Sequence, residues 1–217
     1  MRVSQPSPVA ASRGTGRWRL QAAVAAVGFS AAFLLCYVVM VRTAAGQAAD
    51  VRLFRLVFGV VPAGVPSELV TGFARAASIV VLAGGAAVLG IAAMGRRAWA
   101  ALVAAVLTVG VSVALGAYLR DEVLTRPQFT DEPFPLNGLP STHATAAAAL
   151  TVAVVLLWPR HRPWWLVNTA GVVLLVVAAG NIVSQAHRPS DVVASLLLVG
   201  AVACGSLALA GPPGPRH

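Results

Sequence analysis

Two short polar stretches carry most of the side chains in this chain that could take part in catalysis. The first, residues 120–143, contains Arg126-Pro127 and Pro140-Ser141-Thr142-His143. The second, residues 181–191, contains His187-Arg188-Pro189-Ser190-Asp191. Imidazoles, guanidinium groups, hydroxyls and a carboxylate together suit phosphate chemistry, because guanidinium pairs with phosphate oxygens in a bidentate manner. The sequence therefore indicates a site for a phosphate compound.

The stretch around His187 has two interpretations. As a helix start, it places Pro189 at the first helical position and Asp191 in the first turn, facing the positive end of the helix dipole. As a catalytic motif, it offers His187 as a nucleophile, with Asp191 fixing the imidazole tautomer so that the other ring nitrogen can attack. Because Pro189 lies between the two residues, ideal i,i+4 helical geometry is not assumed.

The stretch that ends at His143 also marks a helix start, with Ser141 as the N-cap. The same geometry makes an anion site, since free backbone N–H groups and the helix dipole attract phosphate. His143, inside the first turn, could donate a proton to a leaving group. Arg120 and Arg126 follow an apolar segment and are either interfacial anchors or phosphate ligands.

The rest of the chain is too apolar for a water-soluble domain. Hydrophobic residues make up 58% of the 217 residues and charged residues 11%, whereas soluble domains carry about 25% charged residues. The sixteen positive charges are all Arg and are scattered, so the net charge of +9 does not indicate nucleic-acid binding. Cys36 and Cys204 lie in apolar segments without accompanying ligands, and we expect no disulfide and no metal site.

Six apolar segments are long enough to cross about 30 Å of hydrocarbon, which predicts an all-α, polytopic membrane helix bundle. They are residues 20–41, 73–94, 99–119, 142–158, 164–185 and 191–210. We expect a disordered cytoplasmic tail (residues 1–18), a six-span membrane domain (19–211) and a second cytoplasmic tail (212–217). A cleaved signal peptide is the competing interpretation of the first segment, although signal h-regions have only about 7–15 residues.

The charges predict the orientation of the segments. Two short basic turns, residues 95–97 and 159–163, satisfy the positive-inside rule if they are cytoplasmic. Both termini are then cytoplasmic, all seven acidic residues are outside, and both polar stretches reach the same outer face. At that face the sequence also predicts a short interfacial helix, residues 51–61 capped by Asp50, or alternatively a plain surface loop.

In this order and on this topology, the motifs resemble those of the type 2 phosphatidic acid phosphatase superfamily, the six-span lipid phosphate phosphatases. The family's motifs are Lys-x6-Arg-Pro, Pro-Ser-Gly-His and Ser-Arg-x5-His-x3-Asp, and their counterparts here are residues 120–127, 140–143 and 180–191. The resemblance implies that His187 is the nucleophile, forming a phosphohistidine, and that Asp191 orients it. It also implies that His143 is the general acid for the leaving group.

The resemblance further implies that Arg126, Ser141 and the backbone at Thr142 bind the phosphate oxygens. Arg120 stands for the family's Lys, but it lies one residue closer to Arg126. Thr142 replaces the motif glycine. Asn181 replaces the motif Arg and brings a donor without charge, and losing one transition-state donor typically costs about 10²–10³ in rate. Arg188 is the candidate to supply the missing charge.

These assignments predict a membrane enzyme that hydrolyses a lipid phosphate or diphosphate at the outer face of a bacterial cell membrane, without metal or other cofactor. The expected partners are the lipid substrate and the membrane. The alternative is a catalytically impaired relative that binds lipid phosphate or a partner protein; Thr142 and Asn181 favour it, and the retained histidines and Asp191 oppose it. A transporter is disfavoured, because ionisable residues inside the spans are nearly absent.

Overall fold

The structure, a computed structural model, describes residues 8–58, 67–129, 137–158, 163–183 and 187–210. In these ranges the chain forms seven α-helices and two short π-helical segments, and it forms no strand. Five helical segments are long and apolar enough to cross a membrane. The predicted all-α class and multi-pass membrane character are confirmed.

The helices follow the predicted apolar segments closely. The five long segments are α1 (Pro8–Cys36) continued by η1 (Tyr37–Val41), α3 (Ser67–Gly95), α4 (Trp99–Tyr118) continued by η2 (Leu119–Val123), α6 (Trp164–Val183) and α7 (Pro189–Ala210). Two helices are shorter, α2 (Ala44–Phe58) and α5 (Thr142–Leu157). With 16 residues, α5 is about 24 Å long.

The N-terminal part differs from the prediction in two ways. First, α1 begins at Pro8, so residues 8–18 are helical where a disordered tail was expected; residues 1–7 and the predicted tail at 212–217 lie outside the described residues. Second, the prediction that Asp50 caps a helix was wrong. The cap is Thr43, whose hydroxyl accepts from the Gly46 N–H at 3.0 Å, and the alanines that follow favour helix and carry α2 past Asp50.

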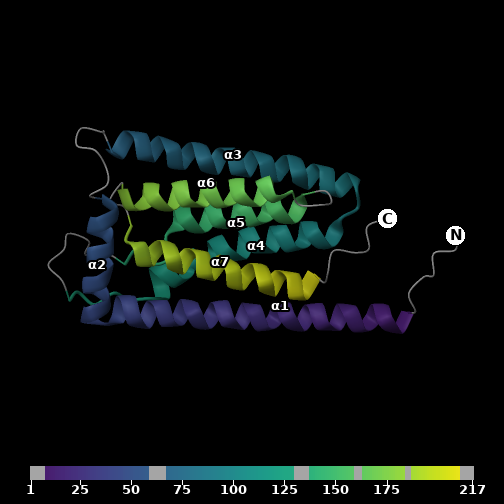
Figure 1. Cartoon of the computed structure of the whole chain (residues 1–217), viewed down its shortest axis with the longest axis horizontal. Coiled ribbons are helices and arrows are strands. Elements are labelled where there is room, and N and C mark those ends of the chain that lie inside the picture. The colour runs from purple at the N-terminus through teal and green to yellow at the C-terminus, as the bar shows by residue number, and fades with distance from the viewer. Residues whose placement is uncertain (1–7, 59–66, 130–136, 159–162, 184–186, 211–217) are drawn as a thin grey trace.

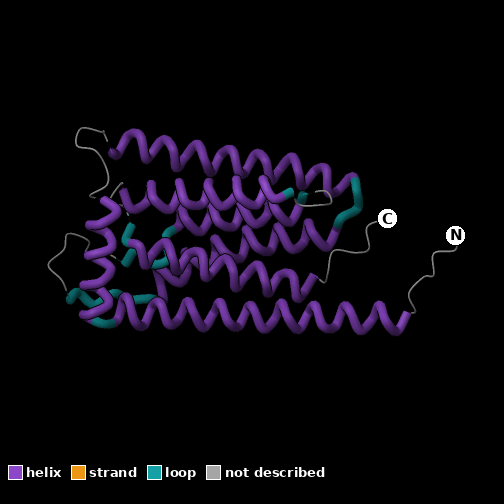
Figure 2. Tube along the Cα trace, viewed as in Figure 1, coloured by secondary structure: helices purple, strands orange, loops and turns teal. Residues whose placement is uncertain are grey.

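The long helices run along a common axis, and α2 lies across one end of the bundle (Figure 1). Figure 2 shows the same arrangement, with the helices in purple and the described loops in teal. In the centre, α5 packs against α3, α4, α6 and α7, while α1 lies outside and packs along α7. The buried face of α5 is rich in alanine, including Ala147, Ala148, Ala149 and Ala153, and small residues let helices approach closely.

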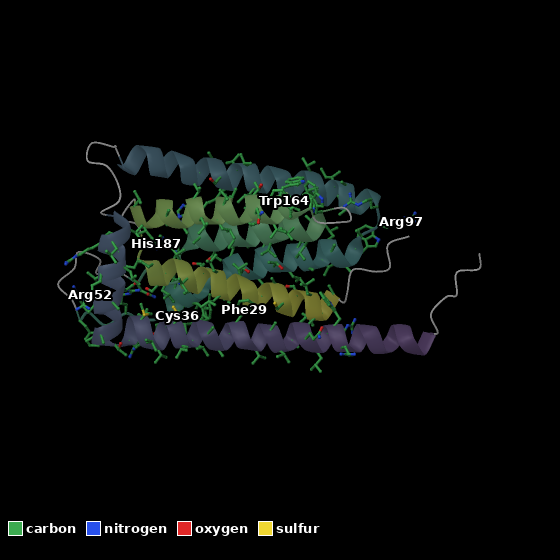
Figure 3. The ribbon with its side chains drawn as sticks, in the orientation of Figure 1. Phe29, Cys36, Arg52, Arg97, Trp164 and His187 are labelled. Atoms are coloured by element: carbon green, nitrogen blue, oxygen red, sulfur yellow. The ribbon has the colours of Figure 1, made fainter. Side chains whose placement is uncertain are left out.

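The two ends of the bundle differ in character. His187 and Arg52 lie near the end crossed by α2, whereas Arg97, in the turn between α3 and α4, lies at the opposite end (Figure 3). The loop before α5 and the loop between α6 and α7 both reach the α2 end. The bundle therefore brings the two polar stretches together, as the sequence predicts.

Candidate active site

The starts of α5 and α7 are joined by hydrogen bonds. The backbone N–H of Ser141 donates to the Asp191 carbonyl at 3.2 Å, and Ser195 Oγ lies 3.0 and 2.8 Å from the carbonyl oxygens of Ser141 and Asp191. The predicted N-cap is confirmed, since Ser141 Oγ accepts from the Ala144 N–H. The predicted start of α7 at Pro189 is also confirmed. Two helix N-termini, each a favourable place for an anion, therefore meet at one point.

His187 and Asp191 face each other at this point. The ring Nδ1 of His187 lies 3.6 Å from Oδ2 of Asp191, and the two side chains are 13% and 4% exposed. This distance exceeds that of a hydrogen bond, and Nδ1 is buried without a hydrogen-bond partner among the described residues. The same Oδ2 accepts from the backbone N–H of Arg188 at 3.1 Å. Asp191 thus lies beside the imidazole and is hydrogen-bonded to the backbone of the residue that follows it.

Arg126 reaches the same carboxylate from the other side. Its Nη2 donates to Asp191 Oδ1 at 2.8 Å and lies 3.5 Å from Ser190 Oγ. The Arg126 side chain is only 4% exposed. Its Nε and Nη1 are buried, and in the part of the chain that the structure describes neither has a hydrogen-bond partner. Unsatisfied buried donors are costly, so this guanidinium offers two groups to a ligand with acceptor oxygens.

Arg120 is less buried and already paired. Its Nε and Nη2 donate to the carboxylate of Asp121 at 2.7 and 2.9 Å, and its Nη1 donates to the Thr142 hydroxyl. Thr142, which stands where the family motif has glycine, therefore links Arg120 to the start of α5. Exposed ion pairs contribute about 0–1 kcal/mol, so the pair with Asp121 is weak enough for a phosphate to replace it.

The three remaining sequence candidates lie at the same end. His143 is exposed in the first turn of α5, and Arg188 is buried beside His187. Asn181 is fully buried near the end of α6. The side-chain Nδ2 of Asn181 donates to the Val177 carbonyl at 2.9 Å. The backbone carbonyl of Asn181 accepts from the backbone N–H of His187 at 3.1 Å. The backbone of Asn181 therefore anchors the backbone of His187. The hydrogen bond from the Asn181 side chain to Val177 is made within α6.

The segment before α5 closes over the His187–Asp191 pair. A Cβ at Gly138 would lie 2.5 Å from Asp191 Oδ2 and 3.1 Å from His187 Nδ1, so only glycine allows the backbone to come this close. The side-chain Nδ2 of Asn137 lies 2.9 to 3.4 Å from three carbonyl oxygens, those of Arg120, Leu124 and Leu139. Neither residue was predicted, because Asn-Gly in a polar loop signals no more than a turn.

Asp50, on α2, is a second buried carboxylate in the site. Its Oδ1 accepts from the Ser190 backbone N–H at 2.9 Å, and its Oδ2 accepts from the Ser190 hydroxyl at 2.5 Å. Oδ2 also lies 3.9 Å from Nη1 of Arg126. Burial raises the pKa of the Asp50 carboxyl, although the two hydrogen bonds from Ser190 act in the opposite direction.

Gln47, one turn before Asp50, contacts the segment that follows Arg126. Its Nε2 donates to the Pro127 carbonyl at 2.6 Å and to the Val41 carbonyl at 2.8 Å, and its Oε1 accepts from the Phe129 N–H at 3.3 Å. The sequence feature that could have indicated Gln47 and Asp50 is their spacing along a helix. The buried positions of α2 are 46, 47, 50, 51 and 54, which lie on one face of a helix.

The described residues contain no group of three or more His, Cys, Asp and Glu side chains that could hold a metal ion. The arrangement gathers an imidazole, a carboxylate, buried guanidinium donors and two helix N-termini. These groups together can bind a phosphate and attack its phosphorus atom.

Comparison with known proteins identifies the family. A family model described as the PAP2 superfamily matches residues 97–212, which is more than half of the chain. The match contains both polar stretches and begins after α3. Neither a curated protein nor a solved structure matches the chain. The resemblance of the motifs to the type 2 phosphatidic acid phosphatases is thereby confirmed, and the chain belongs to the PAP2 superfamily, whose members are generally phosphatases.

Proposed function

We propose that this protein hydrolyses a lipid phosphate or diphosphate at the outer face of the cell membrane through a phosphohistidine intermediate. The observation that carries the proposal is the pair of buried donors, Nε and Nη1 of Arg126, beside the His187–Asp191 pair. Arg126 is fixed by Asp191 at Nη2, and its buried Nε and Nη1 have no hydrogen-bond partner among the described residues, which supports a role in binding phosphate oxygens. Family membership supports the reaction class.

In the first step, His187 attacks phosphorus. Because Nδ1 faces Asp191, Nδ1 carries the proton and Nε2 carries the lone pair that forms the N–P bond. The P–O bond to the lipid breaks as this bond forms. His143, exposed at the start of α5, donates a proton to the leaving oxygen, so the lipid departs as an alcohol or a monophosphate.

In the second step, water hydrolyses the phosphohistidine. The deprotonated His143 takes a proton from the water, whose oxygen attacks phosphorus while the N–P bond breaks. Inorganic phosphate leaves and His187 returns to its starting state. The phosphoryl oxygens are held throughout by positive charge and by the N–H groups at the starts of α5 and α7. The proposed phosphate-binding residues are Arg120, Arg126, Ser141, Thr142, Asn181 and Arg188.

The proposed topology has six spans, with the short helix α5 as the fourth. α5 lies at the centre of the bundle among four other helices, so its ends need not reach as far as those of helices exposed to lipid. An even number of spans puts both termini on the same side of the membrane, and the short basic turns make that side the cytoplasm. The α2 end, which carries the site, is then outside, and the Arg96-Arg97 turn is inside, in accord with the positive-inside rule.

The experiment is phosphate release by the purified protein in lipid vesicles, across polyprenyl phosphates, polyprenyl diphosphates and glycerophospholipid phosphates. We expect release that disappears in His187→Ala and rises in Asn181→Arg, which restores the family's charge. A matched control is Glu122→Gln, since Glu122 is an exposed carboxylate on η2 at the same end of the bundle. A wild-type protein that releases no phosphate from any of these lipids would contradict the proposal.

A further inference from the structure

Asp50 lies outside the part of the chain that the family accounts for. The family match covers residues 97–212, whereas Asp50 is on α2, which is separated from the matched part by α3. The side chain is nevertheless fully buried. A buried carboxylate destabilises a fold unless its charge and lone pairs are satisfied, so the partners of Asp50 indicate what it is retained for.

All the polar partners that the structure gives Asp50 belong to the two polar stretches. Ser190 donates twice, through its N–H and its hydroxyl, and Arg126 lies within ion-pair distance. We infer that Asp50 is a positioning residue for the phosphatase site, fixing Ser190 and holding the Arg126 guanidinium in place against Asp191. This inference rests on the proposed phosphatase function.

The first part of this role concerns the start of α7. Since α7 begins at Pro189, the Ser190 N–H is one of the first helical N–H groups, which have no partner within the helix. Asp50 supplies that partner from another helix, and its charge lies at the positive end of the α7 dipole. Asp191 accepts from the Arg188 N–H, two residues before Ser190, as an acidic residue does in a capping box. Asp50 thus fixes the backbone one residue before Asp191.

The second part concerns Arg126. Asp191 holds Nη2 at 2.8 Å, and Asp50 lies 3.9 Å from Nη1 on the other branch of the guanidinium. The two carboxylates therefore flank one guanidinium and limit its rotation. Gln47 holds the next residue along the chain through the Pro127 carbonyl. Through two side chains one turn apart, α2 contacts both the phosphate-binding segment and the segment of the nucleophile.

The test measures orthovanadate affinity and kcat/KM for wild type, Asp50→Ala, Asp50→Asn, Ser190→Ala and the double variant Asp50→Ala/Ser190→Ala. Orthovanadate resembles the phosphoryl group in transfer. We expect Asp50→Ala to weaken orthovanadate binding and kcat/KM by about 10²-fold, because misplacement of about 1 Å can cost that much. Asp50→Asn keeps an acceptor for the Ser190 N–H and should stay within about tenfold of wild type. Glu122→Gln should match wild type.

The double variant tests whether Asp50 acts through Ser190. If it does, Asp50→Ala costs less in the Ser190→Ala background than in wild type, because coupled residues are not additive. Fully additive losses overturn the inference, as does an Asp50→Ala variant with wild-type affinity and turnover. If Asp50→Ala does not fold, Ser190→Ala carries the test, and unchanged orthovanadate affinity in that variant overturns the inference.

The two proposals can fail separately. A wild-type protein that binds orthovanadate but releases no phosphate from any lipid contradicts the phosphatase function. In that case the orthovanadate affinities alone decide the role of Asp50. A wild-type protein that releases phosphate, with Asp50→Ala and Asp50→Asn equally impaired and equally reduced in melting temperature, supports the phosphatase and overturns the positioning role.

Discussion

Arg126 and His187 share one carboxylate: Nη2 of Arg126 donates to Oδ1 of Asp191 at 2.8 Å, while Nδ1 of His187 lies 3.6 Å from Oδ2. Asp191 is therefore bonded more closely to Arg126, the proposed phosphate-binding residue, than to His187, the proposed nucleophile. A phosphate that binds Arg126 competes for its positive charge. This competition would free Asp191 to approach His187, so the bonds of Arg126 matter for both binding and catalysis.

Replacing Arg126 by Lys tests the importance of its forked geometry. Lys keeps the charge but offers a single point donor, so it cannot bind Asp191 and two phosphate oxygens at the same time. We expect Arg126→Lys to lower kcat/KM by about 10²–10³-fold, measured by phosphate release. The control is Arg52→Lys, because Arg52 is exposed on α2 (Figure 3). Equal activity of the two variants would show that charge alone suffices at position 126.

Gly138→Ala tests the close approach of the loop to the catalytic pair. The added Cβ would lie 2.5 Å from Asp191 Oδ2, and overpacking of this kind typically costs about 1–3 kcal/mol. We expect a lower melting temperature together with a loss of phosphate release, because the pair must move to make room. Gly110→Ala is the matched control, since nothing lies within 4 Å of a Cβ at that helical position. A fully active Gly138→Ala variant would refute this account of the loop.

Asp50→Asn should change stability in a pH-dependent manner. Burial raises the pKa of Asp50 above its ordinary value of 3.8. The protonated carboxyl is therefore favoured by folding. Its contribution to the free energy of unfolding is fully present below pH 3.8 and is lost as pH rises through the folded-state pKa. The charged and titratable groups facing Asp50 are Arg126, Asp191 and the Cys36 thiol. At neutral pH we therefore expect Asp50→Asn to melt at a higher temperature than wild type, with the difference disappearing under acid conditions.

The measurement for this prediction is the melting temperature of both proteins in detergent between pH 4 and pH 8. A lower melting temperature for Asp50→Asn at neutral pH would contradict it. Higher stability combined with weaker orthovanadate binding would mean that the charge of Asp50 is retained for function at a cost in stability.

Asn137→Ala should lower the melting temperature less than Asn137→Asp does. Its amide Nδ2 lies against the carbonyl oxygens of Arg120, Leu124 and Leu139. Asn137→Ala leaves these acceptors without this donor, at about 1–3 kcal/mol. Asn137→Asp replaces the donor by a carboxylate that repels all three, so we expect a larger fall in melting temperature at neutral pH. The difference should shrink at low pH as the new carboxyl is protonated, and its absence at neutral pH would argue against the amide's role as donor.

The parts of the fold that depend on local properties were predictable. The length and polarity of a segment decide whether it can cross hydrocarbon, so the limits of α4 to α7 were close to those expected from residues 99–210. Ser141 and Pro189 mark helix starts because capping is decided by neighbouring residues. The positive-inside rule predicted that the two polar stretches share one end of the bundle and that the basic turn at Arg96-Arg97 lies at the other end.

The parts that depend on distant contacts were not predictable. Asp50 is separated from Ser190 by most of the chain, and next to an apolar run it has the features of an ordinary N-cap; only the packing of α2 across the bundle shows its true partner. The proximity of Gly138 to Asp191 likewise follows from the packing of α7 and leaves no trace in the neighbouring residues.

The link between the starts of α5 and α7 is made by the backbone, from the Ser141 N–H to the Asp191 carbonyl. Main-chain groups are present whichever side chain occupies either position. Substitutions within the motifs can therefore alter the chemistry of the site without separating its two halves. A chain built in this way can carry Thr142 in place of the motif glycine and Asn181 in place of the motif arginine while His187, Asp191 and Arg126 stay together. The backbone thus holds the two polar stretches together independently of the side chains that they carry.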